Sequence, residues 1–229
     1  MLPNLLVQRI RTAQARLETT VITTANRLTP NLARLSQAGA GGVIRTIANA
    51  TLSTFGPIAA QAGQDSYSEL RAFAFDEPFR AQALEVDIDR LAAPVISGAM
   101  RLQLDGRFAA ARTSIGVSLG RSVINAYREQ MVSNSLNDRQ ATGYQRVASP
   151  NACAFCLVVA LNEYTTFEQS GGYHKNCSCT TIPIFRSLGA FRPSYYDQFD
   201  SDYSNALADA SSNSAEDIFA QMRVNTGRK

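Results

Sequence analysis

The sequence predicts a mainly α-helical protein with a small β module near its C-terminal end, and three observations predict it. Apolar residues recur at helical spacing through residues 3–28 and again through 107–135. Short runs typical of strands follow at 144–148 and 180–185. All four cysteines and the single histidine lie between those two runs, so the second half of the chain is organised differently from the first.

The first helix is expected over residues 3–28, because apolar side chains recur every three, four or seven positions: Leu6, Ile10, Ala13, Leu17, Val21 and Leu28. Thr29 and Pro30 look like an N-cap followed by a first-turn proline, which predicts that a second helix starts there. The glycines at 39, 41 and 42 are then expected to break that helix.

Two short helices are expected next, over residues 43–53 and 58–73, because Gly56-Pro57 should end or redirect the chain between them. The acidic stretch over 75–89 is mixed in character and is expected to hold a turn at Glu77-Pro78.

A further helix is expected over 89–104, with a bend at Pro94. The helix over 107–135 has the clearest apolar face, made by Phe108, Ile115, Leu119, Val123 and Tyr127. Gly116 and Gly120 lie four residues apart in it and would let another helix approach closely, although simple packing economy explains them as well.

The chain beyond Arg192 is rich in Tyr, Asp, Ser and Asn, which predicts a loosely structured tail with a short helix near residues 215–222. The sequence therefore divides into a multi-helix region over 1–143, a β-hairpin module over 144–190, and a C-terminal tail over 191–229.

Composition and charge limit the class of protein. The longest apolar run, residues 91–100, is too short to span a bilayer, and the N-terminal segment lacks the charge order of a signal peptide. We therefore expect a protein that is made in the cytoplasm and contacts no membrane. Residues 1–50 contain six arginines and one acidic residue, and residues 101–150 contain seven arginines and three acidic residues. Such blocks are either solvated helix faces or surfaces for an acidic partner.

The candidate metal ligands are the four cysteines and the histidine: Cys153, Cys156, His174, Cys177 and Cys179. A C-x2-C turn lets two sulfur atoms reach one ion, and a second pair brought back by a hairpin completes a tetrahedron. Thiolate and imidazole ligands favour zinc over calcium or magnesium. The sequence thus predicts a zinc-stabilised module whose hairpin occupies residues 157–172. The site is expected to be structural, because four protein ligands leave no open position.

Five candidates for four positions leave the second pair of ligands open: His174 with Cys177, Cys177 with Cys179, or His174 with Cys179. Three other interpretations of the cysteines compete with zinc. A redox C-x-x-C needs a strand before it and a helix opening at the motif, in a βαβ context. Two structural disulfides are rare in a cytoplasmic protein. The third alternative is chance clustering.

The strings RVASPNACAFCLVVA and YHKNCSCTTIPIF together resemble the C-terminal module of the phage Mu F-type minor head protein family, a phage head morphogenesis family. Its members carry a C-x-x-C, a variable hairpin, and an H-x-x-C-x-C ending before an extended segment with a proline, here Pro183. Lys175 and Ser178 stand where the more usual ending has proline and arginine. The resemblance covers about residues 139–186; the helical region matches only in character.

This resemblance implies a structural minor capsid protein of a tailed bacteriophage. Such a protein lies inside the virion near the portal, is associated with the portal or the major capsid protein, and takes part in head assembly and in DNA packaging or ejection. The Arg-rich helices could also contact DNA non-specifically.

We expect no enzyme and no small-molecule substrate, although relatives of this length are sometimes labelled capsid maturation proteases. A serine or cysteine protease needs a base, and the only histidine belongs to the metal motif. A zinc protease needs an open metal position. A pair of aspartates hidden among the acids keeps the protease as an alternative. A zinc-containing DNA-binding protein is another, but residues 151–190 carry only Lys175 and Arg186 as basic residues.

Overall fold

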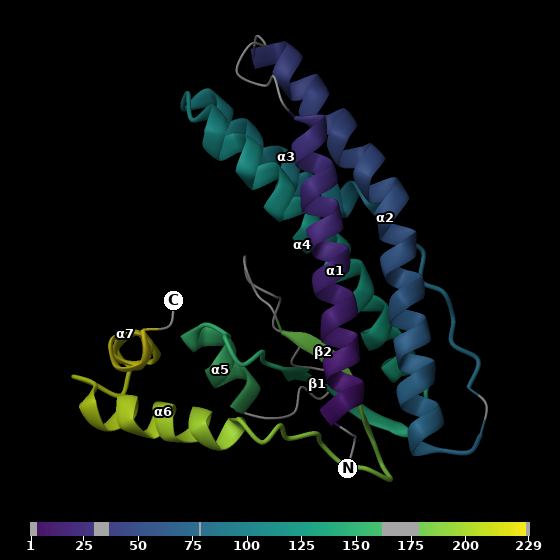
Figure 1. Ribbon diagram of the computed structural model, residues 1–229, viewed down its shortest axis with the longest axis vertical. Coiled ribbons are helices and arrows are strands. Elements are labelled where there is room, and N and C mark those ends of the chain that lie inside the picture. Colours follow the sequence, from purple (N-terminus) through teal and green to yellow (C-terminus); the bar gives the residue numbers. More distant parts are fainter. Residues whose placement is uncertain (1–3, 30–36, 78, 162–178, 228–229) are drawn as a thin grey trace.

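The computed structural model describes residues 4–29, 37–77, 79–161 and 179–227. Four long helices form an elongated bundle (Figure 1): α1 (Asn4–Leu28), α2 (Gln37–Ala74), α3 (Ile88–Leu104) and α4 (Phe108–Asn137). Two strands lie toward the base of the bundle, with three shorter helices beside them: β1 (Ala141–Val147), β2 (Thr180–Phe185), α5 (Ala154–Leu161), α6 (Tyr196–Asp209) and α7 (Ala215–Thr226). The predicted class, mainly helical with a small antiparallel sheet, is confirmed. In the described ranges, no helix has the length and apolar character needed to span a bilayer.

The helix α4 is the centre of the bundle, because it contacts α1, α2, α3 and both strands. Its predicted apolar face is confirmed for Ile115, Leu119, Val123 and Tyr127, whose side chains are at most 1% exposed. Phe108 differs: it lies in the first turn and is 38% exposed.

The helix α2 is continuous over 38 residues, so two predictions for this region were wrong. The glycines at 39, 41 and 42 do not break it, and Gly56-Pro57 does not end it. The physical reason is burial: a stripe of apolar side chains at helical spacing runs through both interruptions and packs into the bundle, comprising Ala40, Ile44, Ala48, Leu52, Ala59, Tyr67 and Leu70. Burial of that stripe outweighs the weak helix propensity of the local breakers.

Thr29 directly follows the last residue of the first helix. Its Oγ1 donates to the carbonyl oxygen of Ala25 at 3.0 Å, across the last turn of α1. The predicted start of the second helix at Pro30 lies outside the described residues. The helix α3 agrees with its prediction to within one residue, and Asp87 caps it by accepting from the amide of Arg90 at 2.9 Å.

Glycines of α4 allow α1 to approach it closely. A Cβ added at Gly116 would lie 2.9 Å from Oδ1 of Asn26, and one at Gly120 would lie 3.0 Å from Cγ of Glu18. The close-approach interpretation of these two glycines is therefore the one that the geometry supports.

Gly63→Ala should destabilise the protein by about 1–3 kcal/mol, because the bundle is already close-packed at this point. The added Cβ would lie 2.6 Å from the carbonyl oxygen of Tyr127, a backbone atom of α4 that has little freedom to move. Gly42→Ala is the matched control, since a Cβ there meets nothing within 4 Å in the same helix. It should stabilise α2 by about 0.5–1 kcal/mol. Urea unfolding followed by circular dichroism measures both, and a neutral Gly63→Ala would contradict the close α2–α4 contact.

A buried ion pair joins α2 to the junction between α4 and β1. The carboxylate of Asp138 accepts from Nε of Arg71 at 2.7 Å, from the hydroxyl of Tyr67 at 3.0 Å and from the amide of Gln140 at 2.9 Å. The guanidinium of Arg71 also donates to the carbonyl oxygen of Glu77 at 3.1 Å. Burial, with the neighbouring carboxylate of Asp138, raises the pKa of Tyr67, so its hydroxyl remains a hydrogen-bond donor. This cluster fixes the beginning of β1 against the bundle.

Both predicted strands are present, and they pair with each other in antiparallel register. Tyr144 lies opposite Pro183, and Val147 lies opposite Thr180. The strand β1 begins at Ala141, three residues before its predicted start. Every residue of β2 is buried, and the strand contacts α4 and α2.

The prediction of a loosely structured tail was wrong for the described residues. The helix α7 contains the predicted 215–222 segment, but α6 was not expected. Gln145 of β1 exchanges two hydrogen bonds with the backbone of Phe191, at 2.6 and 3.0 Å. This region has a buried apolar face instead of a solvated one. It is made by residues of α6 and α7: Tyr196, Phe199 and Ala206 of α6, and Ile218 and Met222 of α7.

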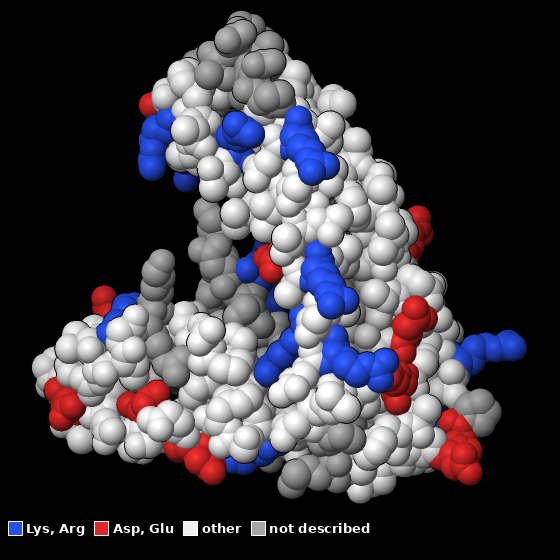
Figure 2. All heavy atoms as spheres, viewed as in Figure 1, with Lys and Arg blue, Asp and Glu red and all other residues white. Residues whose placement is uncertain are grey.

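Several arginines lie at the end of the bundle where α1 and α3 end and α2 and α4 begin (Figure 1), which is the upper end in Figure 2. The four helix ends pack together there. Nη2 of Arg112 donates to the carbonyl oxygen of Asn26 at 3.1 Å, and Gly41 lies against the side chain of Met100. We call this end the helical tip. Its exposed arginines are Arg27, Arg45, Arg101, Arg107 and Arg112.

Candidate metal centre

The pairing of β1 with β2 brings together the two ends of the segment that carries all five predicted ligands. Val147 is the last residue of β1 and Thr180 is the first of β2, and the two lie opposite each other. Every cysteine and the histidine fall in sequence between them. A short ladder therefore gathers both ends of the ligand-bearing segment at one place.

The first two cysteines form a turn that opens a helix. The amide of Ala152 donates to the carbonyl oxygen of Ser149 at 2.9 Å, which makes a tight turn after β1. The amide of Leu157 donates to the carbonyl oxygen of Cys153 at 3.0 Å, so Cys153 lies at the beginning of α5. The amide of Cys156 then points to Sγ of Cys153 at a distance of 3.5 Å. An N–H group directed at sulfur stabilises the negative charge that a metal-bound thiolate carries.

The last cysteine of the chain, Cys179, is placed by the opposite strand. Cys179 directly precedes β2 and is fully buried. Its carbonyl oxygen accepts from Nη2 of Arg128 at 2.5 Å, and the same guanidinium donates to Oδ1 of Asn125 at 3.0 Å. Arg128 is only 2% exposed, and it ties the central helix of the bundle to the end of the ligand segment.

Three further side chains hold the chain where it leaves β1. The carbonyl oxygen of Ala148 accepts from Nη2 of Arg11 at 2.5 Å and from the hydroxyl of Tyr195 at 2.8 Å. The amide of Ala148 donates to the hydroxyl of Tyr196 at 2.9 Å. Burial raises the pKa of Tyr195 and of Tyr196, so neither phenol ionises at neutral pH. None of these three side chains could be identified from the sequence, because their partners are 47 to 137 positions away.

The prediction of a hairpin over residues 157–172 was wrong where it can be compared. Residues 154–161 are the helix α5, whose buried side chains include Ala154, Leu157 and Ala160. Phe155 packs edge-on against Phe219 of α7, with ring centroids 5.9 Å apart. The hairpin was predicted from the length of the segment between the cysteine pairs, whereas the segment begins as a helix that contacts α6 and α7. Residues 162–178 lie outside the described ranges.

The described residues bring two of the predicted zinc ligands together. Cys153 and Cys156 make one sulfur pair, whereas Cys179 does not join them in a group that could hold a metal ion. Within the described ranges, no group of three or more His, Cys, Asp or Glu side chains lies close enough to hold a metal ion. Two of the five predicted ligands, His174 and Cys177, lie outside those ranges, so the complete ligand set is a matter for proposal.

The redox interpretation meets two of its three requirements. A strand precedes the C-x-x-C, and a helix opens at it, with Cys153 half-buried and Cys156 1% exposed. The third requirement is a parallel βαβ crossover. The sheet of the described residues consists of β1 and β2 alone, and they are antiparallel.

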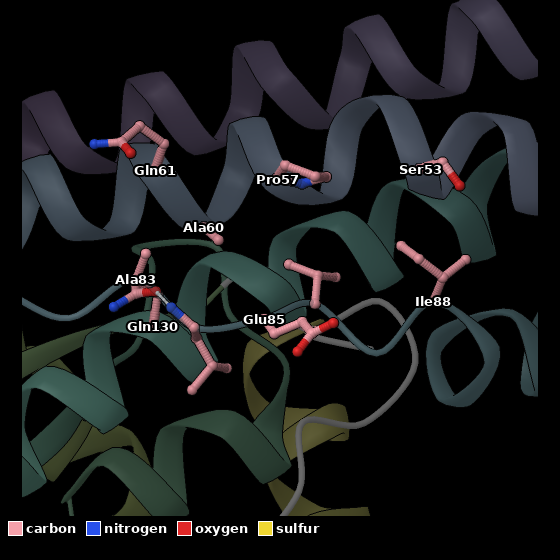
Figure 3. Close-up of a pocket in the computed structure, with 10 residues that line it drawn as sticks. Ser53, Pro57, Ala60, Gln61, Ala83, Glu85, Ile88 and Gln130 are labelled. Carbon is pink, nitrogen blue, oxygen red and sulfur yellow. Dashed lines mark hydrogen bonds between the residues drawn. The ribbon is translucent and has the colours of Figure 1, made fainter.

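A separate groove of about 420 Å³ lies between α2 and the extended segment that leads into α3 (Figure 3). The carboxamide of Gln130 lies at its floor, where Oε1 accepts from the amide of Leu84 at 2.7 Å and Nε2 donates to the carbonyl oxygen of Gln82 at 2.6 Å. These hydrogen bonds hold the extended segment in place. The one carboxylate of the lining, Glu85, is exposed to solvent.

Residues 1–206 match the family model described as VG15 protein. No curated protein matches the chain, and no solved structure matches it.

Proposed function

Because the chain belongs to the VG15 protein family, a family of phage gene products, we propose that it is a structural minor head protein of a tailed bacteriophage. The observation that carries this proposal is the extent of the match. It spans the helical bundle, both strands, the cysteine segment and most of α6, so these parts all fall within the family match. The resemblance of the cysteine segment to the minor head proteins supplies the more specific role, and location inside the virion near the portal follows from it.

We further propose that one zinc ion is held by Cys153, Cys156 and two of His174, Cys177 and Cys179. The ion would cross-link a segment whose two ends are already fixed by the β1–β2 ladder, by Arg128 and by Ala148 with its partners. Its contribution is to the folding of the module, since a filled tetrahedral shell offers no position for substrate. We propose a structural role and not a catalytic one.

The role in the head is tested in the phage or prophage that carries the gene. A nonsense mutation in the gene should abolish or strongly lower the yield of infectious particles, and expression of the wild-type chain from a plasmid should restore it. Mass spectrometry of purified particles should detect the protein among the head components. Normal yields of infectious particles without the protein would contradict the proposal.

The same particles separate the structural role from the two alternatives. A maturation protease would leave the major capsid protein uncleaved when the gene is disabled, whereas a structural protein leaves its processing unchanged in the heads that do form. A DNA-binding regulator would alter phage transcript levels before heads assemble. We expect normal transcripts and normally processed capsid protein.

A further inference from the structure

We propose that copies of this chain associate head to tail, with the helical tip of one copy bound to the acidic C-terminal helices of the next. This association goes beyond a role in the phage head and does not depend on it. Two surfaces of opposite charge, each with exposed apolar side chains, carry the proposal. We call the second surface the C-terminal unit, and it consists of α5, α6 and α7, which contact one another.

The described part of the helical tip is strongly basic. Among its described residues, five exposed arginines, Arg27, Arg45, Arg101, Arg107 and Arg112, accompany one acid, Asp105. None of the five forms an ion pair within the described part of the chain. Elsewhere in the bundle arginines do pair: Arg9 lies 2.8 Å from Glu69, and Arg90 lies 2.5 Å from Glu129. The tip therefore carries an uncompensated positive potential.

The C-terminal unit is acidic. Residues 192–227 hold six acids against Arg192 and Arg223. Figure 2 shows these acids as red side chains on the part of the molecule formed by α6 and α7, away from the blue tip. Arg192 pairs with Asp197 and Asp200, which leaves Asp209 and Glu216 as exposed carboxylates without a cationic partner in the described ranges.

Both surfaces also expose large apolar side chains, which favours a protein over DNA as the partner of the tip. Leu28 and Leu104 are 51% and 57% exposed at the tip, and Phe108 is exposed beside them. Leu207 and Val224 are 40% and 75% exposed on the C-terminal unit. Apolar contacts rimmed by charge are typical of protein interfaces, whereas phosphate backbones offer no apolar surface to such residues.

A single copy cannot bring its own two surfaces together, because they lie at opposite ends of the molecule (Figure 1). The contact must therefore form between copies. It joins two different surfaces, so it is heterologous, and repetition of one rotation produces a closed ring or an open chain. Opposite charges should steer the encounter, and salt should weaken it.

Charge reversal on each surface tests the proposal. The tip variant carries Arg27→Glu, Arg101→Glu and Arg107→Glu. The unit variant carries Asp197→Lys, Asp209→Lys and Glu216→Lys. The control variant reverses three exposed arginines away from the tip: Arg16→Glu, Arg80→Glu and Arg139→Glu. Sedimentation velocity over a range of concentrations at low and high ionic strength measures association, and circular dichroism verifies that each variant is folded.

The wild type and the control variant should self-associate at low ionic strength, and salt should reverse it. Each reversal variant alone should associate at least about tenfold more weakly, because like charges then face each other. An equimolar mixture of the tip and unit variants should regain association, since the acidic tip of one now matches the basic unit of the other. This recovery requires the two surfaces to touch, and a general loss of folding would not produce it.

Two results would overturn the proposal. The first is a wild-type protein that stays monomeric at all concentrations and ionic strengths. The second is failure of the mixed variants to associate while both remain folded. Fluorescence anisotropy with labelled duplex DNA examines the other partner: if a monomeric wild type binds DNA and the tip variant does not, then the tip is a nucleic-acid surface and the head-to-tail contact is wrong.

Discussion

Asp138→Ala should lower the free energy of unfolding by about 3–5 kcal/mol, because it leaves the buried guanidinium of Arg71 without its counter-charge. The side chains of Arg71 and Asp138 are 6% and 3% exposed, so water cannot replace the lost carboxylate. The hydroxyl of Tyr67 and the amide of Gln140 lose their acceptor at the same time. Urea unfolding followed by circular dichroism gives the change.

A double-mutant cycle separates the ion pair from simple loss of packing. Arg71→Met removes the charge and keeps much of the side-chain volume. In the double variant no buried charge is left uncompensated, so its destabilisation should be clearly smaller than the sum of the two single losses. An exposed pair provides the control: Glu129→Ala, which removes the partner of Arg90, should cost about 1 kcal/mol or less. Additive losses for Arg71 and Asp138 would contradict a coupled buried pair.

The sequence predicted the elements whose signal is local and continuous. The helices α1 and α4 each carry one apolar stripe without a strong breaker, and both strands are bounded by turn residues, so their positions could be found. The helix α2 could not be found as one element, because its glycines and Pro57 are local breakers while the stripe that outweighs them is buried only in the folded bundle. The helix α6 was not predicted because its tyrosines and aspartates are typical of a polar tail. Tyr196 and Phe199 are buried only in the folded protein, where they pack against neighbouring residues.

The residues of the candidate site also divide into those that local sequence predicts and those that only the fold identifies. Cys153 and Cys156 were predicted as a pair because their spacing is a local property, and the amide-to-sulfur contact between them agrees with it. Arg128 gave no such signal: it lies on the helix predicted over residues 107–135, and its partner at Cys179 is 51 positions away. A buried arginine of this kind can be recognised only when the fold brings a carbonyl oxygen to it. The last two ligands are to be chosen among His174, Cys177 and Cys179, and the first two of these lie outside the described ranges.

Protein purified under reducing conditions should contain about one zinc ion per chain, measured by elemental analysis. Cys153→Ser and Cys156→Ser should each abolish stoichiometric zinc. For small isolated zinc modules the metal contributes on the order of 10–16 kcal/mol of apparent folding free energy. Here β1, β2 and α5 also pack on the rest of the protein, so folding does not depend on the metal alone. We therefore expect the cysteine variants to lose the ordered structure of the module and to keep the helical bundle folded. Hydrogen exchange should therefore rise across residues 144–186 in these variants and stay low in α4.

Single substitutions of His174, Cys177 and Cys179 should then identify the remaining ligands. Two of the three should lose stoichiometric zinc and the third should retain it, which decides among the three pairings left open by the sequence. Cys179 is fully buried, so Cys179→Ser could unfold the module for reasons of packing alone. Cobalt substitution resolves this, because the charge-transfer absorption of a cobalt-bound protein scales with its number of thiolate ligands. That absorption falls by the contribution of one thiolate only when a cysteine that binds the metal is replaced.

Metal-free protein with four reactive thiols would eliminate the zinc site. Metal-free protein with a reversible Cys153–Cys156 disulfide would favour the redox interpretation, for which α5 already supplies the opening helix.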